Sequence, residues 1–431
     1  MKSNDIIKLA LDIGNLKIKF LLGKLNYEEN KLEVLEYKEI PSRGIKKSII
    51  ENPELLSDTI RDGVMEIRAK SGLDINDVVL AVTGQSIISK TEHVIVNFLE
   101  KEITQNELDM IFNQAEKKLI QNNEIILERE IYNIRINNSG IVKNPIGIIG
   151  KELQGDVHLI AMDEKDLQLL IEVVNRAGLE VESINLSAKA ASIAVLEEED
   201  KHMGVALIDI GEGTTDIIIY KNDKMIYSKS VPLGGMHYIT DLSYLFQISR
   251  VEAADILEKI RKKEFINGYI LVGDTKKVSV EDIKNIIDAR TGDLINFISK
   301  TIEDSGFNGY LGKGIIITGG AIAIDEIYDK VSKNMGYAVR RVYPVPLKGL
   351  ENTSLSMAVV IGLFLDIMEK EYIYLKQSDT VINGKLSKEL ELNTELIKEE
   401  INTKVESSKT KKEKKNSRTI EAIKKWISNF V

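Results

Sequence analysis

Three apolar runs along this chain each lead into a turn rich in glycine. The most regular is Val205 to Tyr220 (VALIDIGEGTTDIIIY), where two apolar runs flank a turn with two glycines and two threonines. A weaker copy, Leu9 to Gly23 (LALDIGNLKIKFLLG), lies near the N-terminus, and Gly314 to Ile322 (GIIITGGAI) contains a third apolar run. Short apolar runs bounded by glycine turns predict buried strands. The first two segments are therefore predicted hairpins, and their similarity predicts a duplicated α/β fold.

Helical spacing of apolar residues appears between these strands. It predicts a helix from Pro53 to Ser71 that Gly72 ends, and the capping box Thr104-Gln-Asn-Glu107 predicts another that runs to about Leu119. Further helical stretches are predicted at Asp166 to Ala177, His237 to Arg261, Ser279 to Ile302 and Ser354 to Met368. The small-residue helix Ser187 to Leu196 suits either close packing against another helix at a hinge or plain core packing.

Other short runs predict the remaining strands. They are Leu32 to Ile40, Asp77 to Val82, Val94 to Leu99, Tyr132 to Ile136, Val157 to Ala161, Val181 to Leu186 and Ala338 to Val342. The strands near the middle of this set, with the helix after Thr104, are predicted to form a small separate unit over residues 83–162.

The glycine turns have the chemistry of a phosphate site. Gly211 and Gly213 let backbone N–H groups turn toward an anion, Thr214 and Thr215 add hydroxyl donors, and Asp209 at the strand end can accept from the waters of a magnesium ion. One Asp-Ile-Gly strand end is more often a plain turn. Two opposed hairpins and a third glycine site, in this order, favour a nucleotide cleft in which Asp12 and Asp209 flank one metal.

Composition limits the class of protein. The chain has 431 residues, 43% hydrophobic and 29% charged, with no cysteine, which predicts several globular domains in a reducing cytoplasm and excludes disulfides and thiolate metal sites. The start of the chain has no run long enough for a signal peptide, and the longest apolar stretch, Met357 to Leu365, is too short for a membrane span. The four histidines share no metal-ligand spacing.

Charge is unevenly distributed. The net charge is −9, but residues 407–431 hold eight Lys or Arg and two Glu, which gives +6 there and −15 elsewhere. An acidic body argues against nucleic-acid binding. In residues 418–431, one face of a helix within an arc of ~140° is apolar, which predicts an amphipathic membrane helix. Its apolar residues are Ile420, Ile423, Trp426, Ile427, Phe430 and Val431.

The alternative for this terminal segment is a helix docked on the body. The preceding stretch, residues 371–417, is rich in Lys, Glu, Ser and Thr and predicts a flexible charged linker. Its ~45 residues give a reach of roughly 35–40 Å. A single anchor of this size binds lipid only marginally, because ordering the helix offsets most of the gain from burial. A filament that displays many anchors binds strongly.

The motifs taken together resemble FtsA, the actin-like bacterial cell-division family. The resemblance covers roughly residues 6–370 and the extreme C-terminus, and its most specific segments are LDIGNLK, KNPIGIIGKELQGDVHLI (143–160), LIDIGEGTTDI and VPLGGMHYITDL. It implies an actin-like duplicated ATPase fold, with residues 1–82 and 163–200 as the first half and 201–370 as the second. It also implies an inserted α+β domain at 83–162 and a small subdomain at 236–312.

The family resemblance also implies function. It implies ATP and magnesium in the cleft, head-to-tail filaments, recruitment of the tubulin-like FtsZ and other divisome proteins, and attachment by the C-terminal helix to the cytoplasmic face of the plasma membrane at the division site. It assigns eleven residues to the nucleotide: Asp12, Gly14, Asn15, Lys17, Asp209, Gly211, Gly213, Thr214, Thr215, Gly319 and Gly320. Asn15 is included as part of the first turn.

The chain departs from the family pattern around the expected nucleotide. Asn15-Leu16 replaces small residues, Glu212 and Ala321 each replace a glycine, and Ala254 and Leu257 align with the family's Glu and Lys for ribose and adenine. No residue that orients an attacking water is identified, and phosphoryl transfer depends on such positioning. We therefore expect binding of magnesium-ATP, weakened by these departures, with slow or absent hydrolysis and no assigned catalytic residue.

For the FtsZ contact, the segment IIDARTGD resembles the FtsA helix that receives the FtsZ tail. The resemblance implies Arg290 and Asp293 as contact residues, and Lys276 and Lys277 add positive charge for an acidic peptide. Three other classes stay open. The first is a small-molecule kinase of the same superfamily, in which the tail would have no role. The second is a DnaK-type chaperone, for which the polar linker is too short to be the substrate-binding domain. The third is a PilM-type pilus-assembly adaptor, against which the C-terminal membrane helix favours FtsA.

Overall fold

Two five-stranded sheets of the same design form the body. The computed structural model describes residues 5–273 and 276–377. In the first sheet the order is β10-β6-β1-β2-β3, and in the second it is β13-β12-β11-β16-β17. Each begins with an antiparallel meander of three consecutive strands and continues with two parallel strands, β6 and β10 or β16 and β17. The predicted duplication is therefore confirmed.

The strands of the first sheet are β1 (Asp5–Ile13), β2 (Lys17–Asn26), β3 (Lys31–Pro41), β6 (Asp77–Val82) and β10 (Glu180–Leu186). Those of the second are β11 (Val205–Ile210), β12 (Thr215–Lys221), β13 (Lys224–Val231), β16 (Ile315–Thr318) and β17 (Val339–Arg341). All six residues of β11 and all four residues of β16 are buried. Continuous apolar runs, rather than alternating ones, form these strands because helices cover both faces of the sheet.

Helices cover the outer face of the first sheet. α1 (Pro53–Ser71) and α3 (Glu164–Arg176) pack there through Leu56, Ile60, Val64 and Val173. The Asn52 side chain caps α1 by accepting from the backbone N–H of Leu55 at 3.0 Å, and Gly72 ends it with φ of +68°. The predicted bounds of this helix are confirmed. Between β3 and α1 the chain forms a small hairpin, β4 (Ile45–Lys46) with β5 (Ile49–Ile50).

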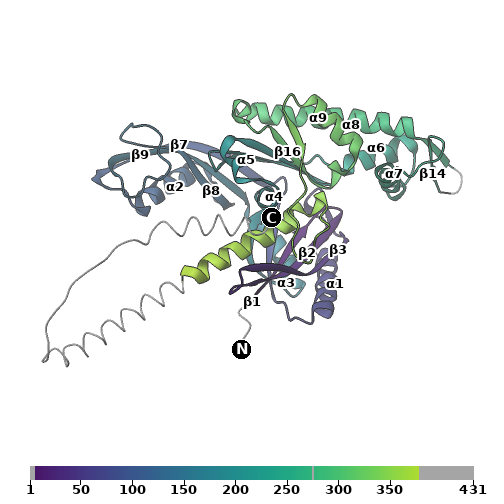
Figure 1. The fold of residues 1–431 in the computed structure, drawn as a ribbon, viewed down its shortest axis with the longest axis horizontal. Helices are drawn as coiled ribbons and strands as arrows, with labels where there is room; N and C mark the ends of the chain where they lie inside the picture. The colour runs from purple at the N-terminus through teal and green to yellow at the C-terminus, as the bar shows by residue number, and fades with distance from the viewer. Residues whose placement is uncertain (1–4, 274–275, 378–431) are drawn as a thin grey trace.

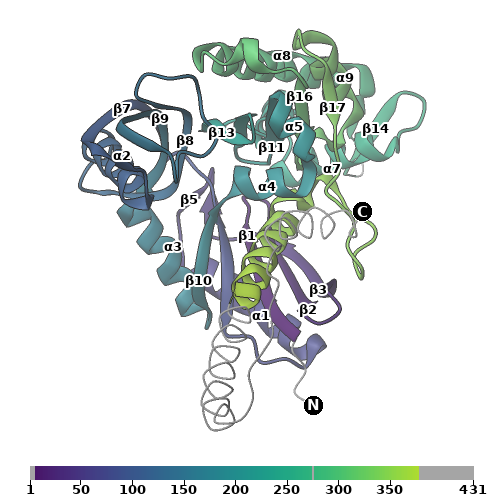
Figure 2. The same ribbon diagram turned by 60° about the vertical axis from the view of Figure 1, so that its left-hand side comes forward.

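Two helices fill the space between the sheets. α4 (Ser187–Val195) and the helix at residues 358–377 share one core with the inner faces of both sheets. Figure 2 shows this last helix, in yellow-green, crossing in front of the first sheet below α4. The backbone approach is close enough that a Cβ on Gly362 would lie 1.7 Å from the carbonyl oxygen of Ala190. Small residues in α4 therefore permit close helix packing.

The last helix extends past the predicted start of the linker at Glu371. It continues to residue 377, where the Tyr372 ring lies 5.7 Å from the ring of Tyr27 and packs on the central core. Lys370 and Asp366, one turn apart, form an ion pair at 2.6 Å. These contacts stabilise the end of the helix, which the polar composition of this segment alone does not predict. Residues 378–431 lie outside the described residues.

The second half carries the remaining helices. α5 (Glu198–Met203) precedes β11, and α6 (Met236–Phe246), α7 (Arg250–Lys262), α8 (Val280–Asp304) and α9 (Asp325–Asn334) follow β13. Single 3-10 turns occur at Asn308–Tyr310, Gly320–Ala323 and Leu355–Met357. A hairpin of β14 (Tyr269–Val272) and β15 (Lys276–Ser279) projects beyond α7 (Figure 1). The strands predicted from the sequence do not include these two.

The inserted unit forms its own three-stranded sheet, β7-β9-β8, covered by α2 (Gln105–Leu119). Its strands are β7 (Ile87–Glu102), β8 (Glu124–Ile136) and β9 (Ile149–Asp163). They are longer than predicted. The prediction followed apolar runs only, and polar residues alternate along the exposed face of these strands. The unit bonds to both halves: Glu128 accepts from Lys189 of α4 at 2.8 Å, and Glu130 from Lys224 of β13 at 2.7 Å. Figure 1 shows it as a separate lobe.

Acid is expected to destabilise the inserted domain through His158. Its ring is 1% exposed, with Nδ1 2.9 Å from Oγ1 of Thr91, and burial lowers the pKa of His158 from 6.5 to about 4. As the pH falls below 6.5, the unfolded chain binds a proton that the folded chain does not. Stability is therefore lost between pH 6.5 and pH 4, by about 3 kcal/mol in all.

A pH series of urea unfolding checks this expectation. Because other buried acids also titrate, the comparison is between the natural chain and His158→Gln. The free energy of unfolding of the natural chain should fall relative to that of the variant as the pH is lowered from 7 to 4. Parallel curves would show that His158 protonates freely in the folded state.

Candidate functional site

The two glycine turns face each other between the halves and touch. Each is closed by a backbone hydrogen bond, from Gly14 N–H to the Lys17 carbonyl at 3.1 Å and from Gly211 N–H to the Thr214 carbonyl at 2.9 Å. A Cβ on Gly213 would lie 2.1 Å from Nδ2 of Asn15. A side chain at position 213 would therefore have to displace Asn15, and the contact sets the distance between the turns.

Asn15 is itself held by the turn between β4 and β5. Its Oδ1 accepts from the backbone N–H of Ser48 at 2.8 Å, and its Nδ2 donates to the Ser48 hydroxyl at 3.2 Å. Ser48 has φ of +60°, a conformation that the tight β4–β5 turn imposes. The sequence marks Asn15 as a departure from a family pattern, and the structure gives this side chain a positioning role.

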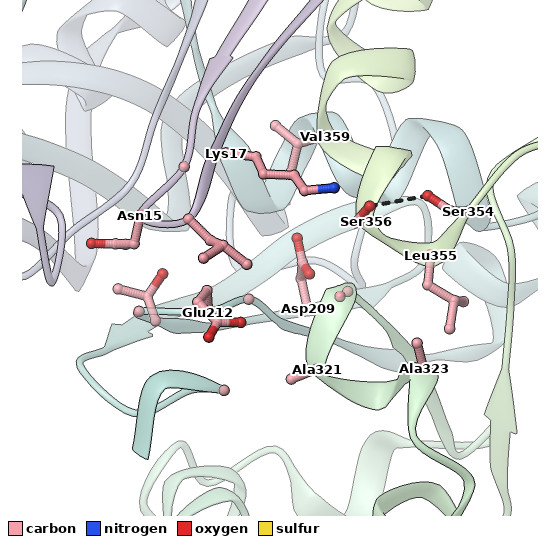
Figure 3. Close-up of a pocket in the computed structure, with 18 of the residues that line it drawn as sticks. Asn15, Lys17, Asp209, Glu212, Ala321, Ala323, Ser354, Leu355, Ser356 and Val359 are labelled. Carbon is pink, nitrogen blue, oxygen red and sulfur yellow. Dashed lines mark hydrogen bonds between the residues drawn. The ribbon is translucent and has the colours of Figure 1, made fainter. Parts of the chain in front are cut away.

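A cleft of about 830 Å³ opens at these turns. That volume lies within the range of small-molecule and cofactor sites. The predicted residues that line it are Asp12, Gly14, Asn15, Lys17, Asp209, Gly211, Gly213, Thr214, Gly319 and Gly320. The third glycine turn thus meets the two hairpins in one cavity (Figure 3). Thr215 does not line the cleft, because its hydroxyl points away and donates to the Leu233 carbonyl at 2.7 Å.

Lys19 is a residue of the cleft that the sequence reasoning missed. Its Nζ donates to Oδ2 of Asp12 at 2.7 Å, and the side chains are only 11% and 10% exposed. The two residues are direct partners in the β1–β2 register. The available signal was the spacing of Lys17 and Lys19, two positions apart at the start of a mainly apolar strand, since alternate residues face the same side.

Two acids of the second hairpin are buried at the floor of the cleft. Burial, together with the charges of Asp216 and Asp12, raises the pKa of Asp209 to about 7. Burial likewise raises the pKa of Asp216 to about 6, although hydrogen bonds lower it. The Thr83 hydroxyl lies 2.8 and 2.9 Å from the two Asp216 oxygens. Thr83 follows β6, so this contact joins the two halves directly.

The far side of the cleft is mostly apolar. α7 contributes Ala254 and Leu257, and the third glycine turn contributes Ala321 and Ala323. At the rim, Nε of Arg261 donates to Oε2 of Glu258 at 2.8 Å. An apolar slot beside bare glycine backbone suits a flat ring, whereas the hairpin side suits charged groups.

Comparison with known proteins decides the family. A model of "Cell division protein FtsA" matches residues 206–362, and a model of the "SHS2 domain inserted in FTSA" matches residues 84–161. Cell division protein FtsA of Pseudomonas aeruginosa is 28% identical over 353 residues, which cover 79% of this chain and 84% of that protein. The Escherichia coli protein is 25% identical, with 79% and 85% covered. The chain belongs to the FtsA family.

A solved structure supports the fold of this FtsA-family chain. The "PilM-PilN type IV pilus biogenesis complex" has a similar structure, with a TM-score of 0.61 and 14% identity, and the match covers 84% of this chain and 98% of that one. This likeness concerns the fold alone. The predicted fold class, an actin-like duplicated ATPase fold with a small inserted α+β domain, is confirmed.

The acids of the cleft are compatible with a hydrated cation. Within residues 5–273 and 276–377, no group of three or more His, Asp or Glu side chains is arranged to hold a metal directly. Magnesium, however, keeps most of its waters and needs few direct ligands. Burial raises the pKa of Asp209, and the charges of Asp216 and Asp12 raise it further; a nearby cation offsets that repulsion. Asp209 and Asp12 thus fit the predicted magnesium site, with Asp12 already paired to Lys19.

The predicted FtsZ-contact residues lie on α8 of this FtsA-family chain. The Arg290 guanidinium binds both oxygens of Asp241 at 2.6 and 2.9 Å and Asp293 at 3.2 Å, and its side chain is 25% exposed. An acidic peptide would therefore have to replace Asp241 as its partner. Lys276 and Lys277 lie in β15, on the projecting hairpin.

The predicted membrane residues Ile420, Ile423, Trp426, Ile427 and Phe430 lie outside the described residues. In the part of the chain that the structure describes, no helix has both the length and the apolar character needed to cross a membrane.

Proposed function

We propose that this chain is an actin-like cell-division protein that binds magnesium-ATP in its cleft, forms filaments and tethers FtsZ filaments to the cytoplasmic face of the membrane. The observation that carries the proposal is the meeting of three glycine turns in one cavity of about 830 Å³ in a chain of the FtsA family. Phosphates fit the polar side, which the glycine turns and Thr214 line, and the base fits the apolar side beside Ala254 and Leu257.

The cleft favours binding over turnover. Burial raises the pKa of Asp209 to about 7 and that of Asp216 to about 6. Asp216, however, already accepts a hydrogen bond from Thr83. No side chain is assigned to orient an attacking water. Positioning of the nucleophile supplies most of phosphoryl-transfer catalysis. We therefore assign slow or absent hydrolysis, with ATP acting to hold the two halves in one arrangement for assembly.

Membrane attachment is assigned to residues 418–431. One amphipathic helix binds lipid weakly, so filaments that display many copies are needed for stable attachment. Self-association, FtsZ and further divisome proteins are the partners in this scheme, and the division site is its location. A PilM-type adaptor shares the fold, but both family models that match this chain belong to FtsA.

Co-sedimentation with liposomes tests the tether. FtsZ filaments are mixed with anionic liposomes and magnesium-ATP, together with either the full chain or a chain that ends at residue 417. FtsZ is expected in the lipid pellet only with the full chain. Equal pelleting with the shortened chain would contradict the role of the terminal helix. Pelleting of this chain without FtsZ would instead point to the pilus-adaptor alternative.

Arg290→Glu is expected to weaken binding of the FtsZ tail peptide at least ~10-fold. The new carboxylate would join Asp241 and Asp293 in an acidic cluster that repels the peptide. The matched control is Lys300→Glu on the same helix, which should leave binding unchanged. Asp241→Asn keeps Arg290 and weakens its internal partner, so it should leave binding equal or tighter. Fluorescence anisotropy of a labelled peptide measures all three. Unchanged binding by Arg290→Glu would show that the peptide binds elsewhere.

A further inference from the structure

Glu212 has a carboxylate oxygen without a partner in the middle of the cleft. Its Oε1 is buried and forms no hydrogen bond within the described part of the chain. Its Oε2 lies against Gly235, where a Cβ would meet it at 2.6 Å, and the same point is 3.4 Å from Cβ of Ala321. The carboxylate therefore lies between the second hairpin turn and the third glycine turn. Figure 3 shows it on the Ala321 side, below Asp209.

A buried acceptor in this state needs hydrogen-bond donors. Burial alone raises the pKa of Glu212 to about 7, so no neighbouring charge compensates for the loss of water. A buried polar atom without a partner is costly, and hydrogen bonds to a carboxylate are among the stronger ones in proteins. A phosphate cannot supply them, because it is an acceptor of like charge. Hydroxyl groups can.

The position of Glu212 agrees with a sugar between base and phosphates. A nucleotide that places its base beside the third glycine turn and its phosphates at the hairpin turns has to lay its ribose across the space between them. On the opposite wall α7 offers Ala254 and Leu257, and the one carboxylate of that helix in the cleft, Glu258, is already bonded to Arg261. Of these two carboxylates, Glu212 is thus the one that has an unused oxygen, and it lies between the second hairpin turn and the third glycine turn.

We propose that Glu212 accepts hydrogen bonds from the ribose hydroxyls and makes the cleft selective for ribonucleotides over 2′- and 3′-deoxynucleotides. The two adjacent hydroxyls of ribose offer two donors, and a carboxylate offers two acceptors, a pairing that other nucleotide-binding folds use. In this chain the carboxylate comes from the phosphate-binding turn rather than from a helix of the nucleoside side. The inference rests on the proposed binding of ATP.

Calorimetric titration with ATP, 2′-deoxy-ATP and 3′-deoxy-ATP, each with magnesium, tests the proposal on the full chain and on Glu212→Ala. The natural chain is expected to bind ATP roughly 10- to 100-fold more tightly than either deoxynucleotide. Glu212→Ala should lose that preference by weakening ATP binding alone. Glu258→Ala is the matched control at the rim and should keep the preference.

Three results would overturn the inference while leaving ATP binding in place. The natural chain could bind all three nucleotides equally. Glu212→Ala could bind ATP more tightly, which would show that the carboxylate repels phosphate. The substitution could change the magnesium dependence and leave the ratio between ATP and deoxynucleotides unchanged, which would assign the carboxylate to the metal. If neither protein binds any of the three at millimolar concentration, the proposed nucleotide function fails as well.

Discussion

Replacement of Gly362 by alanine is expected to lower the free energy of unfolding by about 3 kcal/mol. The added Cβ would lie 1.7 Å from the Ala190 carbonyl oxygen and 2.4 Å from its carbon. Both are backbone atoms of α4, so no flexible side chain can move aside, and the helix at residues 358–377 has to shift away from α4. That shift opens the core that joins the two halves. Urea unfolding followed by circular dichroism measures the loss.

Gly292→Ala is the matched control for this substitution. Gly292 also lies inside a helix, α8, but the nearest atom to its added Cβ is Nζ of Lys330 at 3.9 Å. Because alanine favours the helix over glycine by up to about 1 kcal/mol, this variant should be slightly more stable than the natural chain. Equal stability of the two variants would contradict the close packing of α4 against the last helix.

Lys19→Met is expected to weaken ATP binding at least ~10-fold, or by about 1.4 kcal/mol. Lys19 is the buried cation of the polar side of the cleft, where it bonds to Asp12. Its removal leaves Asp12 without this partner and increases the repulsion between the acids of the floor and a triphosphate. Calorimetry with magnesium-ATP measures the change, and Lys19→Arg, which keeps the charge, should retain most of the affinity.

Lys24→Met supplies the comparison on the same strand. Lys24 lies in β2, outside the cleft lining, where it pairs with Glu33 at 3.4 Å. Its loss should leave ATP affinity unchanged. If Lys19→Met stays folded, with a melting temperature near that of Lys24→Met, and binds ATP like the natural chain, the phosphates do not lie beside Lys19.

Local elements were predictable from the sequence because their signals are local. Pro53–Ser71 carries its own cap and its own left-handed glycine stop, and Thr104 with Glu107 forms the capping box that begins α2. The two Asp-Ile-Gly hairpins and the strand before Gly319 were likewise found from apolar runs and glycine turns. The charged, alternating strands of the inserted domain were harder, since half-polar strands resemble surface loops.

Contacts between distant segments were not predictable. The Asn15–Ser48 hydrogen bonds, the Thr83–Asp216 contact and the unpartnered Glu212 oxygen each depend on how two segments meet in space. The sequence marked Asn15 and Glu212 as departures and placed Thr83 at a domain boundary. It did not show that Asn15 fixes the turn spacing or that Thr83 joins the halves. Only the Asp12–Lys19 pair had a nearby signal, in the alternation along β2.

Calorimetric titration of the full chain with magnesium-ATP tests the central claim most directly. The opposed turns, the 830 Å³ cleft and the third glycine site predict a single binding event with one nucleotide per chain, detectable below millimolar concentration. Absence of heat up to millimolar magnesium-ATP, from a chain that unfolds cooperatively, would contradict it and leave a nucleotide-free scaffold.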